Sequence, residues 1–489
     1  MTDVKLIDVS LRDGNQSVWG ATGVTDRTVR EMAPLLERCG YEALELLTST
    51  IIAVAVRYHK QDPFARLDMA RRLAPTPKLG FLTTGRRFIT FGQTPKALLR
   101  LAYELLRRHG VTRMWVVDPM SDMDSTRDNA RMAKAAGFEE VVAGLCFTLS
   151  PVHTDEFYAE RIARLDDCAE IESLYLKDPS GLLTPKRLET LLPKLRARLK
   201  RLRIDEIHTH CNTGVAPLTL LTAADLGMTK LHCALPPVAN GSSHSNGLQL
   251  VKNLKARGHS VSVDPAAMQA ASDRLRREAR LFNLPEAAPV EYDEDFYRHT
   301  LAGGVLTTTR RQLSEMGRPD LAFRITDEAV RVREDLGWPI VVTPFAQYIV
   351  AQATLNLVTG ERYSRLSDEV VDLLLGEFGP MPGPVDANLL DRAKATARAR
   401  QRAVAAREEP TLSEVRARFD PHLSDEELLL RAVMPAEQVD AMVARRARAA
   451  DGGLADLMDS LSAQDRPWSV SFRAGSGHLA LTGAKGGRA

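Results

Sequence analysis

The chain of 489 residues has little that would take it to a membrane, to nucleic acid or out of the cell. No apolar run approaches the ~18 residues of a membrane span, and the N-terminal segment lacks the apolar stretch of a signal peptide. The 65 Lys and Arg residues against 63 Asp and Glu leave a formal charge of +2, which offers no basic surface for nucleic acid or an anionic membrane. We therefore expect a cytoplasmic protein without a membrane span or nucleic-acid partner, acting on a small molecule.

Cysteine is also scarce, and its spacing excludes two further classes. The five cysteines contain none of the close C-x-x-C pairs of a structural zinc site, and an odd number in a cytoplasmic chain does not indicate a disulfide framework. We expect ordinary reduced, buried thiols. With 44% hydrophobic residues, the chain is long enough for a sizeable core and more than one domain.

The first part of the chain alternates short β-branched runs with longer stretches of helical apolar spacing. This pattern is typical of parallel βα units. Eight strands are predicted, at residues 4–9, 41–47, 78–84, 113–118, 141–148, 173–178, 206–210 and 230–235. Eight such units in roughly 250 residues favour a closed (β/α)8 barrel, a TIM barrel, which we assign to residues 1–275.

The pattern changes beyond about residue 290 to amphipathic helical stretches without strand alternation. We predict a mostly helical C-terminal domain over 285–450 and a partly flexible tail over 451–489. Helices are expected at 307–315, 321–335, 344–359, 367–376, 424–434 and 435–446, with a solvated Ala/Arg-rich helix at 391–407. The glycine-rich tail either forms a hairpin around Ala474–Gly477 or stays disordered.

Polar residues concentrate after the first, sixth, seventh and eighth predicted strands, which are neighbours in a closed barrel. Active sites of such barrels lie at this end of the strands. His208 and His210 stand two apart, so both rings project from one face and could bind one metal ion. Asp13 could add a carboxylate, since Thr25 is better placed to cap the next helix.

Lys177 follows the sixth strand and allows two interpretations. As an ammonium it has no lone pair for a metal and would pair with Asp178. If burial lowers its pKa, the neutral amine can take up CO2 as a carbamate, whose oxygens bind metal. Residue type alone does not decide between them.

Several segments together resemble a known family. They are DVSLRDGNQS, YLKDPSGLLTP, HTHCNTG, SPVHT, HTLAGGVLTTTRRQL and GWPIVVTPFAQYIVAQATLNLVTGERY. In this order they are similar to the carboxyltransferase component of biotin-dependent oxo-acid enzymes, which includes pyruvate carboxylase, the oxaloacetate decarboxylase α-subunit and the transcarboxylase subunit for pyruvate and oxaloacetate. The resemblance covers about residues 3–450.

The resemblance implies roles for individual residues. It implies a divalent metal, zinc, manganese or cobalt, held by Asp13, a carbamylated Lys177, His208 and His210. It places Arg12, Gln16 and Arg57 around the substrate, and Ser242 where the family has a threonine that shuttles a proton between biotin and substrate.

Four positions depart from the family's pattern. The W-G-G-A segment is replaced by Leu46–Thr50, and the arginine of the strand-three L-L-R-G segment is Thr84, with Arg86 and Arg87 close behind. G-T-S-Q-P reads Gly241–Ser245, and a frequent histidine after the loop aspartate is Asn15. Because loss of a planar arginine changes which acid can be held, we expect the carboxyl acceptor to differ from pyruvate.

The resemblance also implies partners. None of the 14 methionines adjoins a lysine, so the M-K-M-like attachment site of biotin carriers is absent, and no segment remains for an ATP-dependent biotin carboxylase. We expect biotin on another chain, a biotin carboxyl carrier protein and a biotin carboxylase subunit as partners, a small oxo acid as substrate, and a homodimer.

Two other functions remain open from the sequence. One is a metal-dependent barrel lyase that performs Claisen or aldol chemistry on an acyl thioester, against which Lys177 and the long helical domain argue. The other is an inactive scaffold subunit of a carboxylase complex, against which the retained Asp13, Lys177, His208 and His210 argue.

Overall fold

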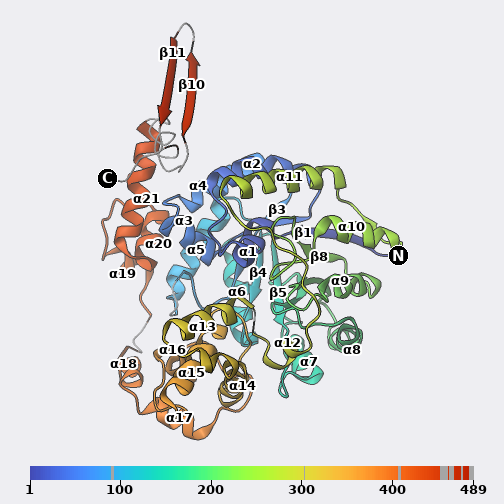
Figure 1. The fold of residues 1–489 in the computed structure, drawn as a ribbon, viewed down its shortest axis with the longest axis vertical. Coiled ribbons are helices and arrows are strands. Elements are labelled where there is room, and N and C mark those ends of the chain that lie inside the picture. The colour runs from blue at the N-terminus through green and yellow to red at the C-terminus, as the bar shows by residue number, and fades with distance from the viewer. Residues whose placement is uncertain are drawn as a thin grey trace.

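A closed barrel of eight parallel strands forms the centre of the computed structural model (Figure 1). The structure describes residues 1–89, 93–301, 303–405, 409–451, 461, 467–474 and 477–483. The barrel strands are β1 (Asp3–Asp8), β2 (Ala43–Thr48), β3 (Lys78–Thr83), β4 (Arg113–Val117), β5 (Glu140–Cys146), β6 (Ser173–Asp178), β7 (Ile204–Thr209) and β8 (Lys230–Cys233). All eight predicted strands are confirmed.

Strand β1 closes the barrel because it pairs in parallel with both β8 and β2. Ile7 lies opposite His232 on one side and Ala43 on the other. A short additional strand, β9 (Ser260–Val261), extends the pairing of β1 beyond the barrel. Closure leaves the eight barrel strands without an open edge and gathers their carboxyl ends into one mouth.

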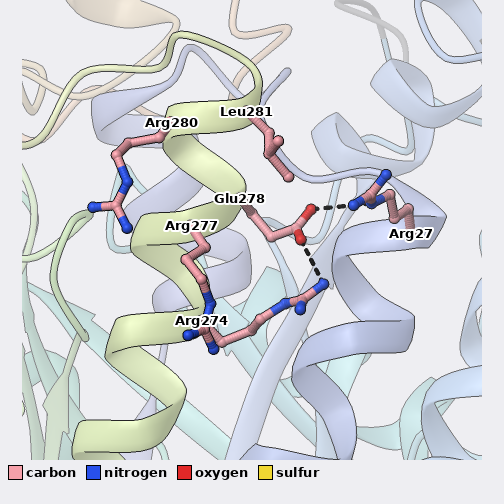
Figure 2. A pocket seen from close by; sticks show the side chains of 6 residues that line it. All are labelled: Arg27, Arg274, Arg277, Glu278, Arg280 and Leu281. Carbon is pink, nitrogen blue, oxygen red and sulfur yellow. Dashed lines mark hydrogen bonds and ion pairs between the residues drawn. The ribbon is translucent and has the colours of Figure 1, made fainter. Parts of the chain in front are cut away.

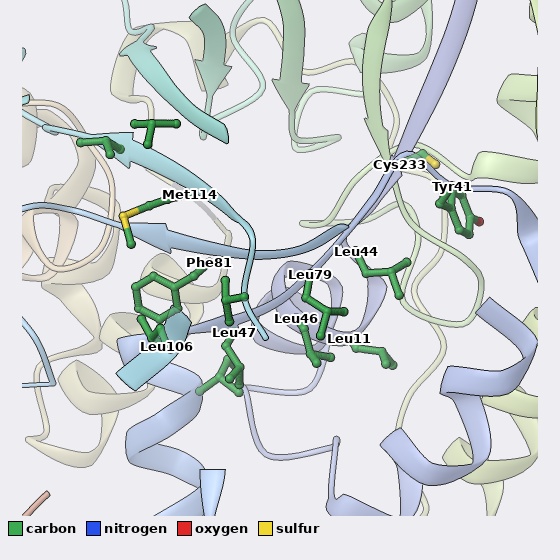
Figure 3. Close-up of a cluster of buried hydrophobic side chains, with 14 of the residues drawn as sticks. Leu11, Tyr41, Leu44, Leu46, Leu47, Leu79, Phe81, Leu106, Met114 and Cys233 are labelled. Carbon is green, nitrogen blue, oxygen red and sulfur yellow. The ribbon is translucent and has the colours of Figure 1, made fainter. Parts of the chain in front are cut away.

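Helices surround the barrel and bury the outward faces of the strands. They are α2 (Asp26–Cys39), α3 (Ser49–Arg57), α4 (Pro63–Leu73), α5 (Lys96–Arg108), α6 (Met123–Ala135), α7 (Asp155–Ala163), α8 (Pro185–Arg196), α9 (Ala216–Asp225), α10 (Gly247–Ala256) and α11 (Pro265–Leu281). Thr25 caps α2 in a capping box, as expected. Figure 3 shows part of the core, where Leu44, Leu79, Phe81 and Met114 lie among other buried side chains.

A group of helices after the barrel packs on the mouth. It comprises α12 (Asp295–His299), α13 (Gly303–Glu315), α14 (Ile325–Asp335), α15 (Phe345–Thr359), α16 (Asp368–Leu374), α17 (Ala387–Lys394) and α18 (Ala397–Ala405). Ser180, after β6, donates a hydrogen bond to the carbonyl of Val341, and buried Arg333 donates to Thr148, after β5. The same apolar cluster contains Trp115 inside the barrel and Phe345 of α15. This group therefore covers part of the mouth.

The last helices take a different place. The segments α19 (Leu412–Arg416), α20 (Asp425–Val433) and α21 (Ala436–Asp451) run beside α3 and α5 along the outside of the barrel (Figure 1). Leu428 and Val439 belong to the apolar cluster of the barrel rather than to that of the mouth helices. The predicted helical region thus covers two separate surfaces.

The Ala/Arg-rich run at 391–407 is not the single solvated helix that we expected. It contributes to two helices, α17 and α18, which are separated near Thr396. Arg398 and Arg402 both bind the carboxylate of Asp372, and this pairing lowers the pKa of Asp372 to about 2 although burial acts to raise it. Arg398 and Arg402 therefore link α18 to α16, while Lys394 and Arg400 are exposed.

Three smaller predictions can also be assessed. The five cysteines are buried and unpaired, as expected. The hairpin is confirmed, since β10 (Trp468–Ala474) and β11 (Gly477–Gly483) pair antiparallel, while residues 475 and 476 between them lie outside the described part. Among the described helices, none is long and apolar enough to cross a membrane.

Candidate active site

A carboxylate and three imidazoles converge inside the barrel mouth. Asp13 lies in the π-helical turn Ser10–Gly14 after β1, His208 and His210 come from β7 and its end, and His244 comes from the loop after β8. Asp13 Oδ2 is 3.2 Å from His208 Nε2, 3.5 Å from His210 Nε2 and 3.2 Å from His244 Nε2. All four residues are buried. The spacing of His208 and His210 correctly predicted that both rings reach one point.

Hydrogen bonds at the opposite ring nitrogens orient two of the imidazoles. His210 Nδ1 donates to the carbonyl of Ser242 at 2.7 Å, and His244 Nδ1 donates to the carbonyl of Thr209 at 3.0 Å. Since a carbonyl only accepts, Nδ1 carries the proton in both rings and Nε2 presents its lone pair to the cluster. Burial lowers the pKa of His244 to about 3, which keeps that ring neutral.

His208 is oriented by a buried chain of polar groups below it. His232 Nε2 donates to Glu206 Oε1 at 2.8 Å, so its Nδ1 accepts from His208 Nδ1 at 3.0 Å. Glu206 also accepts from Arg113 and Trp115. These donors hold the pKa of Glu206 at about 2 although burial acts to raise it. The chain of bonds turns the lone pair of His208 Nε2 towards Asp13.

Lys177 points to the same cluster and does not pair with Asp178. Its Nζ donates to His208 Nε2 at 2.9 Å, while Asp178 accepts hydrogen bonds from the backbone of Leu182 and Leu183. Burial lowers the pKa of Lys177 from its usual value, with Asp13 acting in the opposite direction. The lysine is therefore buried among the candidate ligands.

Arg12 is held between two carboxylates. Its guanidinium lies 2.9 Å from Asp13 Oδ2 and also binds Glu45 from β2. Burial would raise the pKa of Asp13, but Arg12 and His210 hold it well below its usual range. Gln16 lies partly buried in the short helix α1 (Asn15–Val18) that follows Asp13. The carboxylate of Asp13 is thus kept ionised, as a metal ligand must be.

Ser242 lies next to the cluster in the loop after β8. Its Oγ donates to the carbonyl of Ser17 at 2.9 Å, and its own carbonyl accepts from His210. The side chain is partly buried. The hydroxyl is therefore oriented by the loop that carries Asp13.

Arg57 does not lie in this site. It is the last residue of α3, its side chain is exposed, and its Nε donates to Gln438 of α21 at 3.1 Å. Helix α3 packs against α21 on the outside of the barrel, and its final residue lies at this contact. The expectation that Arg57 anchors substrate is corrected by this position.

Known proteins provide an independent comparison. Residues 296–469 match a sequence profile described as a conserved carboxylase domain. A pyruvate carboxylase subunit of Methanocaldococcus jannaschii is 29% identical over 392 residues, which are 80% of this chain and 68% of that protein. The 2-oxoglutarate carboxylase large subunit of Hydrogenobacter thermophilus is 25% identical over 452 residues, 90% of this chain and 68% of that protein. The chain thus spans about two thirds of these relatives.

The sequence is similar to those of subunits of pyruvate carboxylase and of related carboxylases and carboxyltransferases.

Solved structures agree on the fold. The carboxyl transferase domain of Rhizobium etli pyruvate carboxylase with pyruvate superposes with a TM-score of 0.84 at 19% identity, covering 99% of this chain and 84% of that chain. The methylmalonyl-CoA carboxyltransferase 5S subunit of Propionibacterium freudenreichii subsp. shermanii is 25% identical over 392 residues, 80% of this chain and 77% of that protein. A barrel followed by helices is therefore shared with the Rhizobium etli domain.

Arg86 and Arg87 follow Thr84, which stands where the family has an arginine, and both contact other residues. Arg86 binds Asp122 and lies 3.5 Å from Asp118 Oδ2. The Arg87 guanidinium stacks on Phe378 at 3.5 Å from the ring centroid. Neither replaces the arginine that the family carries at Thr84, which is itself exposed.

A cavity of about 380 Å³ lies outside the mouth, between α2 and α11 (Figure 2). Arg27 and Arg274 both reach Glu278 there, while Arg277 and Arg280 complete its basic lining. None of the residues expected in the active site lines it. The cavity is therefore a feature of the outer helix layer.

Sequence reasoning missed His244, His232 and Glu206. His244 stands where the family has glutamine, in a loop without periodicity, and its exchange for a metal-binding residue was the only signal that could have found it. His232 and Glu206 lie on predicted strands, but nothing in one sequence places them below His208.

Proposed function

We propose that the chain is a biotin-dependent carboxyltransferase component, which moves CO2 between carboxybiotin on a separate carrier and the enolate of a small oxo acid. The observation that carries this proposal is the convergence of Asp13 Oδ2 with the Nε2 atoms of His208 and His210 in the barrel mouth. Sequence similarity supports it, since the relatives are named as carboxylases and carboxyltransferases.

The donor set fits a divalent ion. Several imidazole lone pairs and a carboxylate that face one point repel one another unless a cation lies between them, and nitrogen and oxygen donors suit zinc, manganese or cobalt. When bound, such an ion supplies a Lewis acid for the carbonyl oxygen of the oxo acid. Asp13 and the histidines hold it at the mouth, where the substrate enters.

Lys177 has two possible roles at this position. As a carbamate it is a metal ligand, which the family resemblance implies, and as an amine it faces the same cluster as a hydrogen-bond donor. Carbon-13 NMR of the protein equilibrated with labelled bicarbonate distinguishes the two, because a carbamate introduces one labelled carbonyl carbon.

Arg12, Gln16 and Ser242 act on the substrate side. The positive charge of Arg12 stabilises negative charge that develops on the enolate oxygen, and its position is held by Asp13 and Glu45. Gln16 orients the acid. Ser242, with one donor and two acceptor lone pairs, passes a proton between the substrate methyl group and biotin.

We propose that the acceptor differs from pyruvate. Thr84 replaces the family's arginine, and Arg86 and Arg87 are bound to Asp122 and stacked on Phe378. One relative is named as a 2-oxoglutarate carboxylase and another as a pyruvate carboxylase subunit, which supports the view that the acceptor varies among similar proteins. The carboxyl group of the acceptor must therefore be held by other donors.

The working enzyme requires partners. We propose a biotin carboxyl carrier protein that brings carboxybiotin, a biotin carboxylase subunit that loads it, and a homodimer of this chain in the cytoplasm. Relatives named as subunits of carboxylases support a multi-component enzyme.

The decisive experiment supplies the purified chain with a biotinylated carrier and labelled CO2 donor, then tests pyruvate, larger oxo acids and acyl thioesters as acceptors. Carrier-dependent label in an oxo acid supports the proposal. Carrier-independent cleavage of an acyl thioester would instead indicate the lyase, and no reaction with a metal-loaded protein would indicate the scaffold. Exchange with pyruvate at the rate of a known pyruvate carboxylase would overturn only the proposal that the acceptor differs from pyruvate.

A further inference from the structure

Four arginines line the cavity between α2 and α11 in the outer helix layer (Figure 2). Arg274, Arg277 and Arg280 follow one another at intervals of three residues on α11, and Arg27 lies in the first turn of α2. Like charges three residues apart on a helix face repel one another. The arrangement therefore costs free energy unless negative charge lies against it.

Two carboxylates meet only part of this positive charge. Glu278 is buried and lies 3.4 Å from Arg27 and 2.8 Å from Arg274, while Glu31 lies 2.9 Å from Arg274. Four guanidinium groups less two carboxylates leave two positive charges unmatched at the cavity. Glu278 thus holds Arg27 and Arg274 in place without neutralising the whole lining.

Arg277 and Arg280 supply the unmatched charges. Both are exposed, and neither has a hydrogen bond or ion pair with another side chain in the described part of the chain. Arg280 lies in the last turn of α11, where the helix dipole favours a cation, but Arg277 lies before that turn. Arg276 of the same helix is paired with Glu286. The two free guanidinium groups therefore face the cavity as available donors.

The size and lining of the cavity limit what it can hold. Its volume of about 380 Å³ is at the lower end of the range of small-ligand pockets, and exposed Leu281 adds an apolar wall beside the arginines. Guanidinium groups bind phosphate oxygens through paired N–H donors, and a phosphate ester carries roughly two negative charges at neutral pH. Both the donor geometry and the charge of the cavity match this group.

We propose that the cavity between α2 and α11 binds the phosphate group of a small molecule, with Arg277 and Arg280 as the main donors. The ligand is either inorganic phosphate or a phosphorylated metabolite, since the same contacts recognise both. No residue of the barrel mouth lines the cavity, so the site is independent of the carboxyl transfer proposed above.

The test is calorimetric titration of the full chain with inorganic phosphate, AMP and adenosine at one ionic strength, set with chloride. We expect phosphate and AMP to bind the wild type. The double variant Arg277→Ala/Arg280→Ala should bind both at least about 10-fold more weakly, because one charge-assisted hydrogen bond already contributes about this factor. Adenosine, which has no phosphate group, should not bind in the cavity.

The matched control removes the same charge elsewhere on the barrel. Arg72 of α4 and Arg100 of α5 are exposed and have no side-chain partner among the described residues, so Arg72→Ala/Arg100→Ala should bind as the wild type does. An equal loss of affinity in this control would show only a general attraction of anions to the protein surface and would overturn the inference.

The relative affinities of the two phosphate ligands distinguish their sources. AMP binding at least about 10-fold more tightly than phosphate supports a phosphorylated metabolite whose organic part contacts the cavity, and equal affinities support inorganic phosphate. Unchanged affinity in R277A/R280A, or no binding of either ligand to the wild type at about 10 mM, would overturn the inference.

Thermal unfolding provides a second measurement on the same proteins. A ligand of the folded state stabilises it by mass action, so phosphate should raise the Tm of the wild type and of the control more than that of R277A/R280A. An equal rise in all three proteins would contradict binding at this cavity.

Discussion

Two sides of the barrel mouth use charged and polar residues in opposite ways. On the metal side, formed by Asp13, His208, His210 and His244, a carboxylate oxygen and the three Nε2 atoms of the histidines face one another. On the arginine side, which includes Arg86, Arg87 and Asp118, charged groups bind each other or aromatic rings. The first side directs nitrogen and oxygen lone pairs at one point, whereas Arg86 and Arg87 of the second side contact Asp122 and Phe378. We expect the first side to bind a cation and the second side not to hold the acceptor.

Among the substitutions that test this comparison, loss of Asp13 should have the largest effect on metal binding and on carboxyl exchange. We expect Asp13→Ala to abolish metal binding and to lower carboxyl exchange by at least about 1000-fold, because a Lewis-acidic ion contributes several kcal/mol to stabilisation of the transition state. Calorimetric metal titration and an exchange assay measure the two effects. Glu189→Ala, at an exposed position of α8, is the control and should change neither. Retained metal in D13A would show that the metal side has been placed wrongly.

Removal of the Ser242 hydroxyl should have the next largest effect on the metal side. We expect Ser242→Ala to slow exchange by about 100-fold, the lower end of the contribution of a positioned acid or base, while metal affinity stays unchanged. The ratio of kcat between variant and wild type measures the effect. Ser242→Thr restores the family's hydroxyl and should keep most of the activity. If S242A and S242T were equally slow, loss of loop packing rather than loss of the hydroxyl would be responsible.

The buried hydrogen-bond chain from His208 through His232 to Glu206 orients the His208 ring. A substitution at Glu206 tests whether the metal side depends on this chain. Glu206→Gln leaves an acceptor for His232 but removes the charge that pairs with Arg113, and breaking such a buried pair costs about 3–5 kcal/mol of unfolding free energy. Denaturant unfolding measures this loss, and metal affinity should fall about 10-fold.

The pH dependence of stability provides the control for this prediction. The pKa of Glu206 is about 2 in the folded protein, below its ordinary value of 4.5. Its stabilising contribution is therefore complete above pH 4.5 and is lost as the pH falls towards 2. The stability difference between wild type and E206Q should shrink over this range; a constant difference would contradict the assignment.

A substitution on the arginine side should have the smallest effect, and it should raise activity with pyruvate rather than lower it. Thr84→Arg introduces the family's arginine at an exposed position after β3. We expect pyruvate to become about 10-fold better as an acceptor by kcat/KM, since a charge-assisted hydrogen bond contributes about 1.5–3 kcal/mol. Thr84→Lys, which has the charge but not the planar fork, should gain less. An equal gain with both would show that charge alone selects the acceptor.

Much of the fold could be read from the sequence because its signals are local. Short, largely apolar runs such as Ser173–Asp178 indicate a parallel strand that is buried on both faces, and this pattern is visible in a single sequence. The sequence signal for Thr25 as the N-cap of α2 is local as well. The split of the C-terminal helices was not, because periodicity tells which face of a helix is apolar but not which surface that face covers.

The sequence by itself determined the eight strands, the pairing of His208 with His210 on one face, and the nearness of Asp13 to them, because strand period and parallel closure follow from short-range pattern. Only the tertiary structure decided that His244 joins these side chains, that Lys177 turns to His208 rather than Asp178, and that Arg57 lies on the outer surface. These contacts join residues from different βα units, and their geometry depends on how far each loop folds back over the mouth.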